Sequence, residues 1–290
     1  MADAFLDSLI LPAPAKINHF LHITGRRADG YHLLQTLFEF LDYSDELRLS
    51  RRSDGQIIRP LGASGVTAED DLAVRAARLL QAATACRLGV EIEVHKKLPM
   101  GGGLGGGSSD AATVLLGLNQ LWGCGLGLDE LAGLGLQLGA DVPVFVRGRA
   151  AWAEGVGEQL TAVDLPAHWY LVVHPNVHVS TAKVFAFEGL TRNCQPITIA
   201  TSLTGQTQNV FEPVIRKWFP EVDTAFSWLS GLAVTKMTGS GACLFAQFDN
   251  EHEAKQVLAQ LPEKWHGFVA RSVSQSPLHI KLAEQVSQTS

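Results

Sequence analysis

The strongest signal for a functional site is a glycine-rich run at positions 98–112, which reads Leu-Pro-Met-Gly-Gly-Gly-Leu-Gly-Gly-Gly-Ser-Ser-Asp-Ala-Ala. Glycine loses more backbone freedom on folding than any other residue, so ordering a loop with six glycines is costly unless the loop holds something. The run follows a predicted strand over 88–94 and leads into a predicted helix over 108–121, whose first residues, Ser108 and Ser109, suit a helix N-terminus. Bare backbone N–H groups at such a helix start bind anions, so the sequence predicts a phosphate site here.

Several known loop types compete for this run. A P-loop ends in Gly-Lys-Ser/Thr, and the run contains no lysine, so this motif is excluded. The dinucleotide fingerprint G-x-G-x-x-G is satisfied by Gly101, Gly103 and Gly106, but the next acidic residues, Asp129 and Glu130, look like a helix start. A flexible linker is disfavoured because apolar residues bracket the run and an apolar helix follows it. The pattern Pro-x-Gly-x-Gly-Leu-Gly, ending in Ser-Ser at a helix start, remains as a third kind of nucleotide loop.

Composition limits the kind of protein that carries this loop. The chain has 290 residues, 46% hydrophobic and 18% charged, which predicts about two globular domains. A net charge of −6 without a basic run longer than two residues argues against a nucleic-acid partner. Four cysteines without a C-x-x-C pair predict reduced thiols and a cytoplasmic location. The charge-free stretch 111–128 contains polar residues and glycines, so it predicts a buried helix and a loop, with no membrane contact. The oligomeric state is not readable.

The order of helix and strand signals predicts an α+β chain rather than a regular alternation of the two. A boundary in the polar, proline-containing stretch after residue 163 divides the chain into 1–163 and 164–290. Ser-Asp-Gly at 53–55 is typical of a hairpin turn between two strands, and a further strand is predicted to begin at 144–146. The polar stretch 191–208 is predicted to be a loop and suggests no function.

A second small-residue loop and three other segments narrow the function. Thr-Gly-Ser-Gly-Ala at 238–242 lies between two predicted strands and, next to the first loop, suggests a phosphate chain held from two sides. The other segments that complete this set of motifs are Pro-Ala-Lys-Ile-Asn at 14–18, Gly-Arg-Arg-Ala-Asp-Gly-Tyr-His at 25–32 and Gly-Ala-Asp-Val-Pro at 139–143. Together these motifs resemble the GHMP superfamily of small-molecule kinases, which includes galactokinase, homoserine kinase and mevalonate kinase. The segment at 25–32 is similar to one branch of it, whose substrate is a cytidine-diphosphate-linked sugar alcohol.

The resemblance implies a two-domain α+β fold with the active site in the cleft between an ATP-binding domain and a substrate domain. It implies transfer of the γ-phosphoryl group of ATP to the 2-hydroxyl of the sugar alcohol, in non-mevalonate isoprenoid precursor synthesis. In such a reaction the protein mainly positions the reactants and neutralises charge. Mg²⁺ accompanies the nucleotide. No metal site is predicted from the protein alone, and Ser108 or Ser109 is the only suggested Mg²⁺ ligand.

By the same resemblance Asp141 is the base that accepts the hydroxyl proton, and Lys16 is its cationic partner. Taken alone, Asp141 could be a turn residue, Lys16 a solvated lysine on an edge strand, and Phe185 a core residue. The resemblance assigns ATP binding to Pro99, Met100, Gly101, Gly102, Gly103, Leu104, Gly105, Gly106, Gly107, Ser108, Ser109, Gly239, Ser240 and Gly241. It assigns the sugar-alcohol substrate and its cytosine to Asn18, Tyr31, His32, Thr181 and Phe185.

Three alternative functions remain open at this point. Another kinase of the same superfamily, acting on mevalonate or homoserine, would make the segment at 25–32 a coincidence. A nicotinamide-dependent oxidoreductase would use Gly101, Gly103 and Gly106 as a dinucleotide fingerprint. A non-catalytic nucleotide-binding protein would keep the glycine loops but would not need both Lys16 and Asp141.

Overall fold

The structure is a computed structural model that describes residues 7–204 and 207–289, with side chains up to residue 285. The first half of these residues contains β1 (Ser8–Arg26), β2 (His32–Arg52), β3 (Ile57–Leu61), α1 (Leu72–Thr84), β4 (Gly89–His95), α2 (Gly106–Leu121), α3 (Leu128–Leu138), α4 (Val142–Arg147), β5 (Ala151–Glu154) and β6 (Gln159–Ala162). The second half contains β7 (Trp169–His174), α5 (Thr181–Ala186), α6 (Ile199–Ser202), α7 (Glu212–Trp218), α8 (Pro220–Ser230), β8 (Thr235–Met237), β9 (Leu244–Phe248), α9 (Glu251–Leu258), β10 (His266–Val273) and α10 (Pro277–Thr289).

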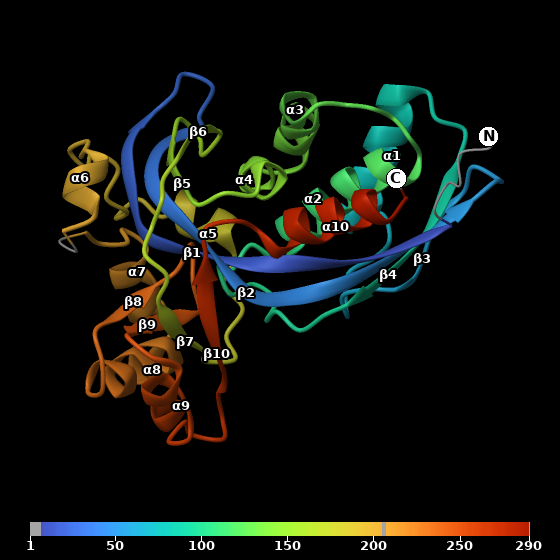
Figure 1. Ribbon diagram of the computed structural model, residues 1–290. Coiled ribbons are helices and arrows are strands. Elements are labelled where there is room, and N and C mark those ends of the chain that lie inside the picture. Colours follow the sequence, from blue (N-terminus) through green and yellow to red (C-terminus); the bar gives the residue numbers. More distant parts are fainter. Residues whose placement is uncertain (1–6, 205–206, 290) are drawn as a thin grey trace.

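The described strands form one ten-stranded sheet with the path β3-β4-β2-β10-β7-β9-β8, while β1 and β5 also pair with β2 and β6 pairs with β5. The long strands β1 and β2 run antiparallel and form the spine of the molecule, as Figure 1 shows. Strand β10 links an N-terminal lobe, which contains β1 to β6, with a C-terminal lobe, which contains β7 to β9. It pairs with β2 only through Ser272 and Val273 and with β7 along the rest of its length. One continuous sheet therefore connects the two ends of the molecule.

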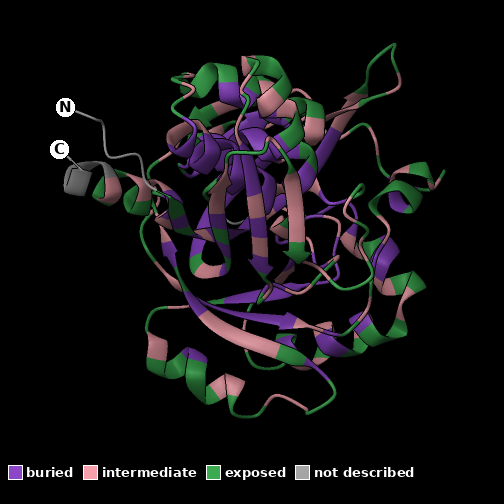
Figure 2. Cartoon of the chain, turned by 90° about the vertical axis from the view of Figure 1, so that its right-hand side faces the viewer, coloured by how far each residue is buried: buried purple, intermediate pink, exposed green. Residues whose placement is uncertain are grey.

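The first apolar core lies between the N-terminal strands and the helices that cover one face of them. It joins α1, α2, α3 and α4 to the sheet, and Leu278 of α10 packs into it. Helix α2 is apolar on nearly all sides and is buried by the sheet and its neighbouring helices, as expected of a helix without a polar face. In Figure 2 the buried residues gather between helices and sheet, while the outer turns are exposed.

The second apolar core joins β7, β8 and β9 to α5, α7 and α8, and it includes Leu21 and Ile23 from the far end of β1. The N-terminal strand thus contributes to this core, just as α10 returns to the first core. The division of the chain near residue 163 therefore stays a prediction. None of the described helices is both long enough and apolar enough to cross a membrane.

Three local predictions were wrong, the first of them in part. The stretch 191–208, predicted to be a loop, contains the short helix α6 at Ile199–Ser202, whose N-terminus is capped by the Thr198 side chain. Residues 142–147 form helix α4 and not a strand, because Pro143 suits the first turn of a helix and burial of the valines against the first core overrides their strand propensity. The predicted hairpin at residues 53–55 does not form either. Instead β3 pairs in parallel with β4, because α1 crosses over between them and places β4 next to β2.

Candidate functional site

Strand β1 carries the two polar side chains at the centre of the site. Lys16 and Asn18 are two residues apart, so both point to the same face of the strand. The Lys16 side chain is only 2% exposed, and its ammonium group donates to Asn18 Oδ1 at 2.5 Å and to the carbonyl oxygen of Gly103 at 3.0 Å. The backbone N–H of Lys16 also donates to the carbonyl of Leu104 at 3.0 Å. The lysine is thus fixed against the glycine-rich loop.

Asp141 meets Lys16 from the other side of the site. Its Oδ2 lies 3.2 Å from Lys16 Nζ, although the two residues are far apart in the sequence. Asp141 occupies the N-cap position of α4, but its side chain accepts no capping hydrogen bond. The carboxylate is 37% exposed, so it can receive a proton from a molecule in the site while the buried ammonium neutralises its charge. The structure brings the two predicted catalytic residues into direct contact.

The two glycine loops are hydrogen-bonded to each other. The backbone N–H of Ala242 donates to the carbonyl of Gly101 at 3.3 Å, and that of Cys243 donates to the carbonyl of Gly102 at 3.0 Å. A side chain at Gly102 would place its Cβ 2.5 Å from the Cys243 sulfur, so only glycine fits this contact without a shift. The first loop then enters α2 at Gly106, two residues earlier than predicted. The arrangement confirms that both loops border one space.

That space is a cavity of about 1060 Å³, lined by residues from both lobes. Every predicted site residue lines it except Ser109 and Gly241. Ser109 is fully buried at the start of α2, and its hydroxyl has no hydrogen-bond partner among the described residues. Gly241 does not line the cavity, and a Cβ at this position would meet the Met237 side chain at 3.0 Å. Contact of these two residues with ATP stays a prediction, as it does for the assigned residues that line the cavity.

The three aromatic residues predicted for cytosine all line the cavity, and two of them are stacked on each other. The His32 ring stacks on Phe185, with ring centroids 4.9 Å apart and an interplanar angle of 27°. Tyr31 also lines the cavity, and 64% of its surface is exposed, so its ring is free to cover a ligand. Burial lowers the pKa of His32, and the nearby guanidinium groups of Arg192 and Arg26 lower it further. The lowered pKa favours the neutral form of the His32 imidazole.

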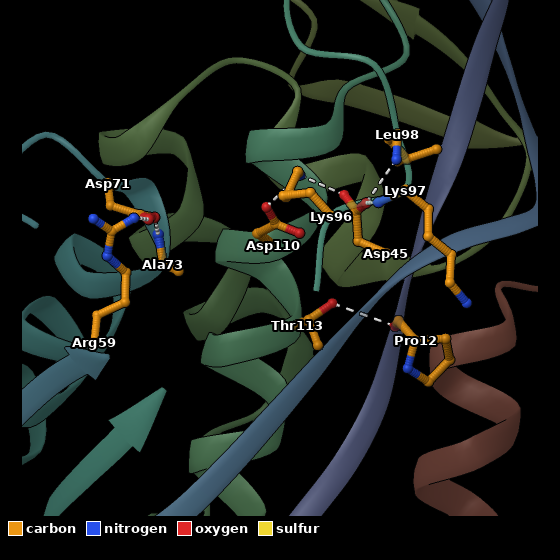
Figure 3. A network of polar contacts seen from close by, with 10 residues as sticks. All are labelled: Pro12, Asp45, Arg59, Asp71, Ala73, Lys96, Lys97, Leu98, Asp110 and Thr113. Carbon is orange, nitrogen blue, oxygen red and sulfur yellow. Dashed lines mark hydrogen bonds and ion pairs between the residues drawn. The ribbon is translucent and has the colours of Figure 1, made fainter. Parts of the chain in front are cut away.

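Beneath the glycine loop lies an ionic network that the sequence did not indicate, drawn in Figure 3. Lys96, which directly follows β4, binds Asp110 Oδ2 at 2.7 Å and also pairs with Asp45 of β2. Asp45 accepts backbone hydrogen bonds from Lys97 at 2.5 Å and from Leu98 at 2.8 Å, which fixes the start of the loop. Burial raises the pKa of Asp110 to about 7, although Lys96 opposes this rise. The signal available in the sequence was Asp110 within the glycine motif, next to its two serines.

The oxygens that line the cavity fit a magnesium ion that arrives with a nucleotide. Among the described residues there is no group of three or more His, Cys, Asp and Glu residues that could hold a metal by itself. Mg²⁺ in phosphoryl-transfer sites usually keeps several waters and takes one or two protein oxygens besides those of the phosphates. The Asp141 carboxylate and the Ser108 hydroxyl offer such oxygens at the mouth of the glycine loop.

Comparison with known proteins shows the class to which this site belongs. The family model for the GHMP kinases N terminal domain matches residues 71–149, and the model for the GHMP kinases C terminal domain matches residues 193–267. The chain therefore belongs to the GHMP kinase family, and its two-domain α+β fold is confirmed.

Relatives within the family are more specific. The 4-diphosphocytidyl-2-C-methyl-D-erythritol kinase of Alkalilimnicola ehrlichii is 59% identical over 267 residues, which cover 92% of each chain. A crystal structure of 4-(cytidine 5'-diphospho)-2C-methyl-D-erythritol kinase, 33% identical, matches with a TM-score of 0.78 over 91% of this chain and 99% of that chain. Homoserine kinase from Cytophaga hutchinsonii, 18% identical, matches with a TM-score of 0.68 over 95% and 98% of the two chains and shares the fold alone. The branch predicted from the sequence is thereby confirmed.

Proposed function

We propose that this protein transfers the γ-phosphoryl group of ATP to the 2-hydroxyl of 4-diphosphocytidyl-2-C-methyl-D-erythritol, a step in non-mevalonate isoprenoid precursor synthesis. The observation that carries the proposal is the contact between Lys16 and Asp141 at the mouth of the glycine loop. A base, a cation and a phosphate cradle within one cavity are the parts that phosphoryl transfer requires. The high identity to relatives named for this substrate supports the choice of alcohol.

In the proposed reaction the substrate hydroxyl lies next to Asp141, whose carboxylate accepts the proton as the oxygen forms its bond to the γ-phosphorus. The bond between that phosphorus and the β,γ-bridging oxygen breaks, and the electron pair leaves with ADP. Lys16 stabilises the charge on the transferred group, and the backbone N–H groups of the loop hold the phosphates that remain. Mg²⁺ bound with ATP supplies further neutralisation of the phosphate charge.

The two ends of the cavity suit the two nucleotides differently. At one end Tyr31, His32 and Phe185 provide aromatic surfaces on which the cytosine of the substrate can stack. Elsewhere Val66 and Leu72 contribute apolar surface near the glycine loop, which suits the adenine of ATP. The proposal includes a cytoplasmic location, as the unpaired cysteines suggest, and small-molecule substrates without a nucleic-acid or membrane partner.

An ADP-release assay with purified protein, ATP and Mg²⁺ tests the proposal directly. We expect turnover with 4-diphosphocytidyl-2-C-methyl-D-erythritol and none above background with mevalonate or homoserine at equal concentration. Preferred turnover of mevalonate or homoserine would assign the chain to another branch of the family. ATP binding without turnover of any alcohol would support a non-catalytic nucleotide-binding protein, and tight binding of NAD(H) in place of ATP would revive the oxidoreductase.

A further inference from the structure

Arg192 lies in the segment between α5 and α6, where the sequence suggested no function. Its guanidinium group donates five hydrogen bonds, and four of them go to backbone carbonyls of the chain just before it: Phe185 at 2.8 Å, Phe187 at 2.6 Å, and Glu188 and Leu190 at 3.2 Å each. The fifth runs from Nε to Nε2 of His32 at 3.1 Å, across 160 positions of sequence. One side chain therefore connects the turn that follows α5 to the first residue of β2.

The segment around Arg192 is itself fastened to the central strands. The backbone N–H of Cys194 donates to the carbonyl of Ile23 in β1 at 2.9 Å. The buried Gln35 side chain in β2 donates to the carbonyl of Ile197 at 3.2 Å and accepts from the N–H of the same residue at 2.9 Å. Arg192 is thus held by the same two strands that carry Lys16 and His32.

The hydrogen bond to His32 decides where that imidazole carries its proton. An arginine side chain can only donate, so the Nε2 atom that receives the bond must be unprotonated. In a neutral imidazole the proton then lies on Nδ1, which is left as a donor for a ligand. The charged groups that face His32 are Arg192 and Arg26, and both disfavour a second proton on the ring. Stacking on Phe185, whose carbonyl Arg192 also binds, fixes the plane of the ring.

We propose that Arg192 is a positioning residue, which holds His32 in the tautomer with its proton on Nδ1 and keeps the ring stacked on Phe185, so that the nucleobase end of the cavity is formed before the substrate binds. A planar fork that binds several oxygens at once is needed for this, and a lysine cannot replace it. This inference rests on the proposed function, because it takes the cytosine of the substrate as the group that meets His32 and Phe185. Preorganisation of this kind lowers the cost of ordering the site on binding.

The test combines kinetics with direct observation of His32. Arg192→Lys keeps the positive charge, Arg192→Met removes all donors, and Arg149→Lys is the control, because Arg149 pairs with Asp164 at an exposed position. We expect KM for the cytidyl substrate, and Kd for cytidine diphosphate as a probe, to rise about tenfold in both Arg192 variants, as for loss of one charged hydrogen bond. KM for ATP should change less than about twofold, since the phosphate loop is not touched. The control should match the wild type in all three values.

Nitrogen-15 NMR of the histidines in the unliganded wild type should show the His32 proton on Nδ1. In Arg192→Met this single tautomer should be lost, and the pKa of His32 should rise because a nearby positive charge is removed. A wild-type proton on Nε2, unchanged affinity for cytidine diphosphate, or an equal rise of both KM values would each overturn the proposal. If the wild type fails to phosphorylate the cytidyl substrate, the proposed function fails, whereas the NMR result still decides the role of Arg192. The same wild-type spectrum decides it if the variants do not fold.

Discussion

Replacing Gly103 with alanine should separate the two glycine loops. Gly103 has a backbone φ of +78°, and a Cβ at this position would lie 2.3 Å from the carbonyl oxygen of Thr238 and 3.2 Å from the backbone nitrogen of Gly241. Both atoms belong to the backbone of the second loop, so neither can turn aside as a flexible side chain would. The carbonyl of Gly103 also accepts from Lys16 Nζ, so a shift of this residue disturbs the catalytic pair.

The expected cost has two parts. An alanine with left-handed backbone geometry is strained by about 1–2 kcal/mol. Overpacking against a rigid neighbour typically adds about 1–3 kcal/mol. The sum is roughly 2–5 kcal/mol. This cost lowers the free energy of unfolding, weakens ATP binding to the distorted loop, or is divided between the two. If only about 2 kcal/mol falls on ATP binding, Kd for ATP rises by about thirtyfold.

Two other glycines supply matched controls for an assay of urea unfolding and ATP titration. Gly125 has a φ of +71° and nothing within 4 Å of its would-be Cβ, so Gly125→Ala carries the strain without the clash. Gly133, within α3, has neither the strain nor a neighbour, and Gly133→Ala should stabilise the protein by about 0.5–1 kcal/mol. Both controls should keep the wild-type affinity for ATP. If Gly103→Ala costs no more than Gly125→Ala and binds ATP normally, the close contact of the two loops is refuted.

Three further predictions concern the site. Asp141→Asn should bind ATP normally and lose turnover by roughly 10²–10⁴-fold in the ADP-release assay, and a variant within a few-fold of wild type would eliminate Asp141 as the base. Tyr31→Ala should raise KM for the cytidyl substrate by about tenfold or more through lost stacking and leave KM for ATP unchanged, whereas equal effects would place Tyr31 outside the cytosine end. In the folded state the pKa of Asp110 is raised from 3.8 to about 7, so the folded protein binds this proton more tightly than the unfolded chain does. The folded protein therefore loses stability as pH rises from about 4 to 7. Asp110→Asn should flatten that part of the pH dependence of the unfolding free energy, and an unaltered slope would contradict the raised pKa.

The sequence by itself determined the parts of the site whose geometry is set by neighbours in the chain. The glycine run could be placed between a strand and a helix because backbone freedom and N-terminal residues act over a few positions. The spacing of Lys16 and Asn18 on one strand is local in the same sense. The kinase family followed from such contiguous motifs, and the relatives confirm it.

Where the structure depended on residues distant in the sequence, local sequence patterns gave a wrong prediction or none. The valines of 142–147 favour a strand in isolation, and only burial among neighbouring helices makes them a helix. Asp45 belongs to none of the sequence motifs, yet it holds the start of the glycine loop through backbone groups more than 50 positions away. Arg192 lay in a segment without any motif, although it binds His32.

The local chain thus decided which backbone groups could hold phosphate, because a loop conformation is a property of consecutive residues. The tertiary structure alone decided that Lys16 meets Asp141 and that Arg192 meets His32, because each distance depends on how strands β1 and β2 are packed against segments from other parts of the chain. Contacts of that kind are set by the burial of apolar side chains in two separate cores, and no short stretch of sequence contains them.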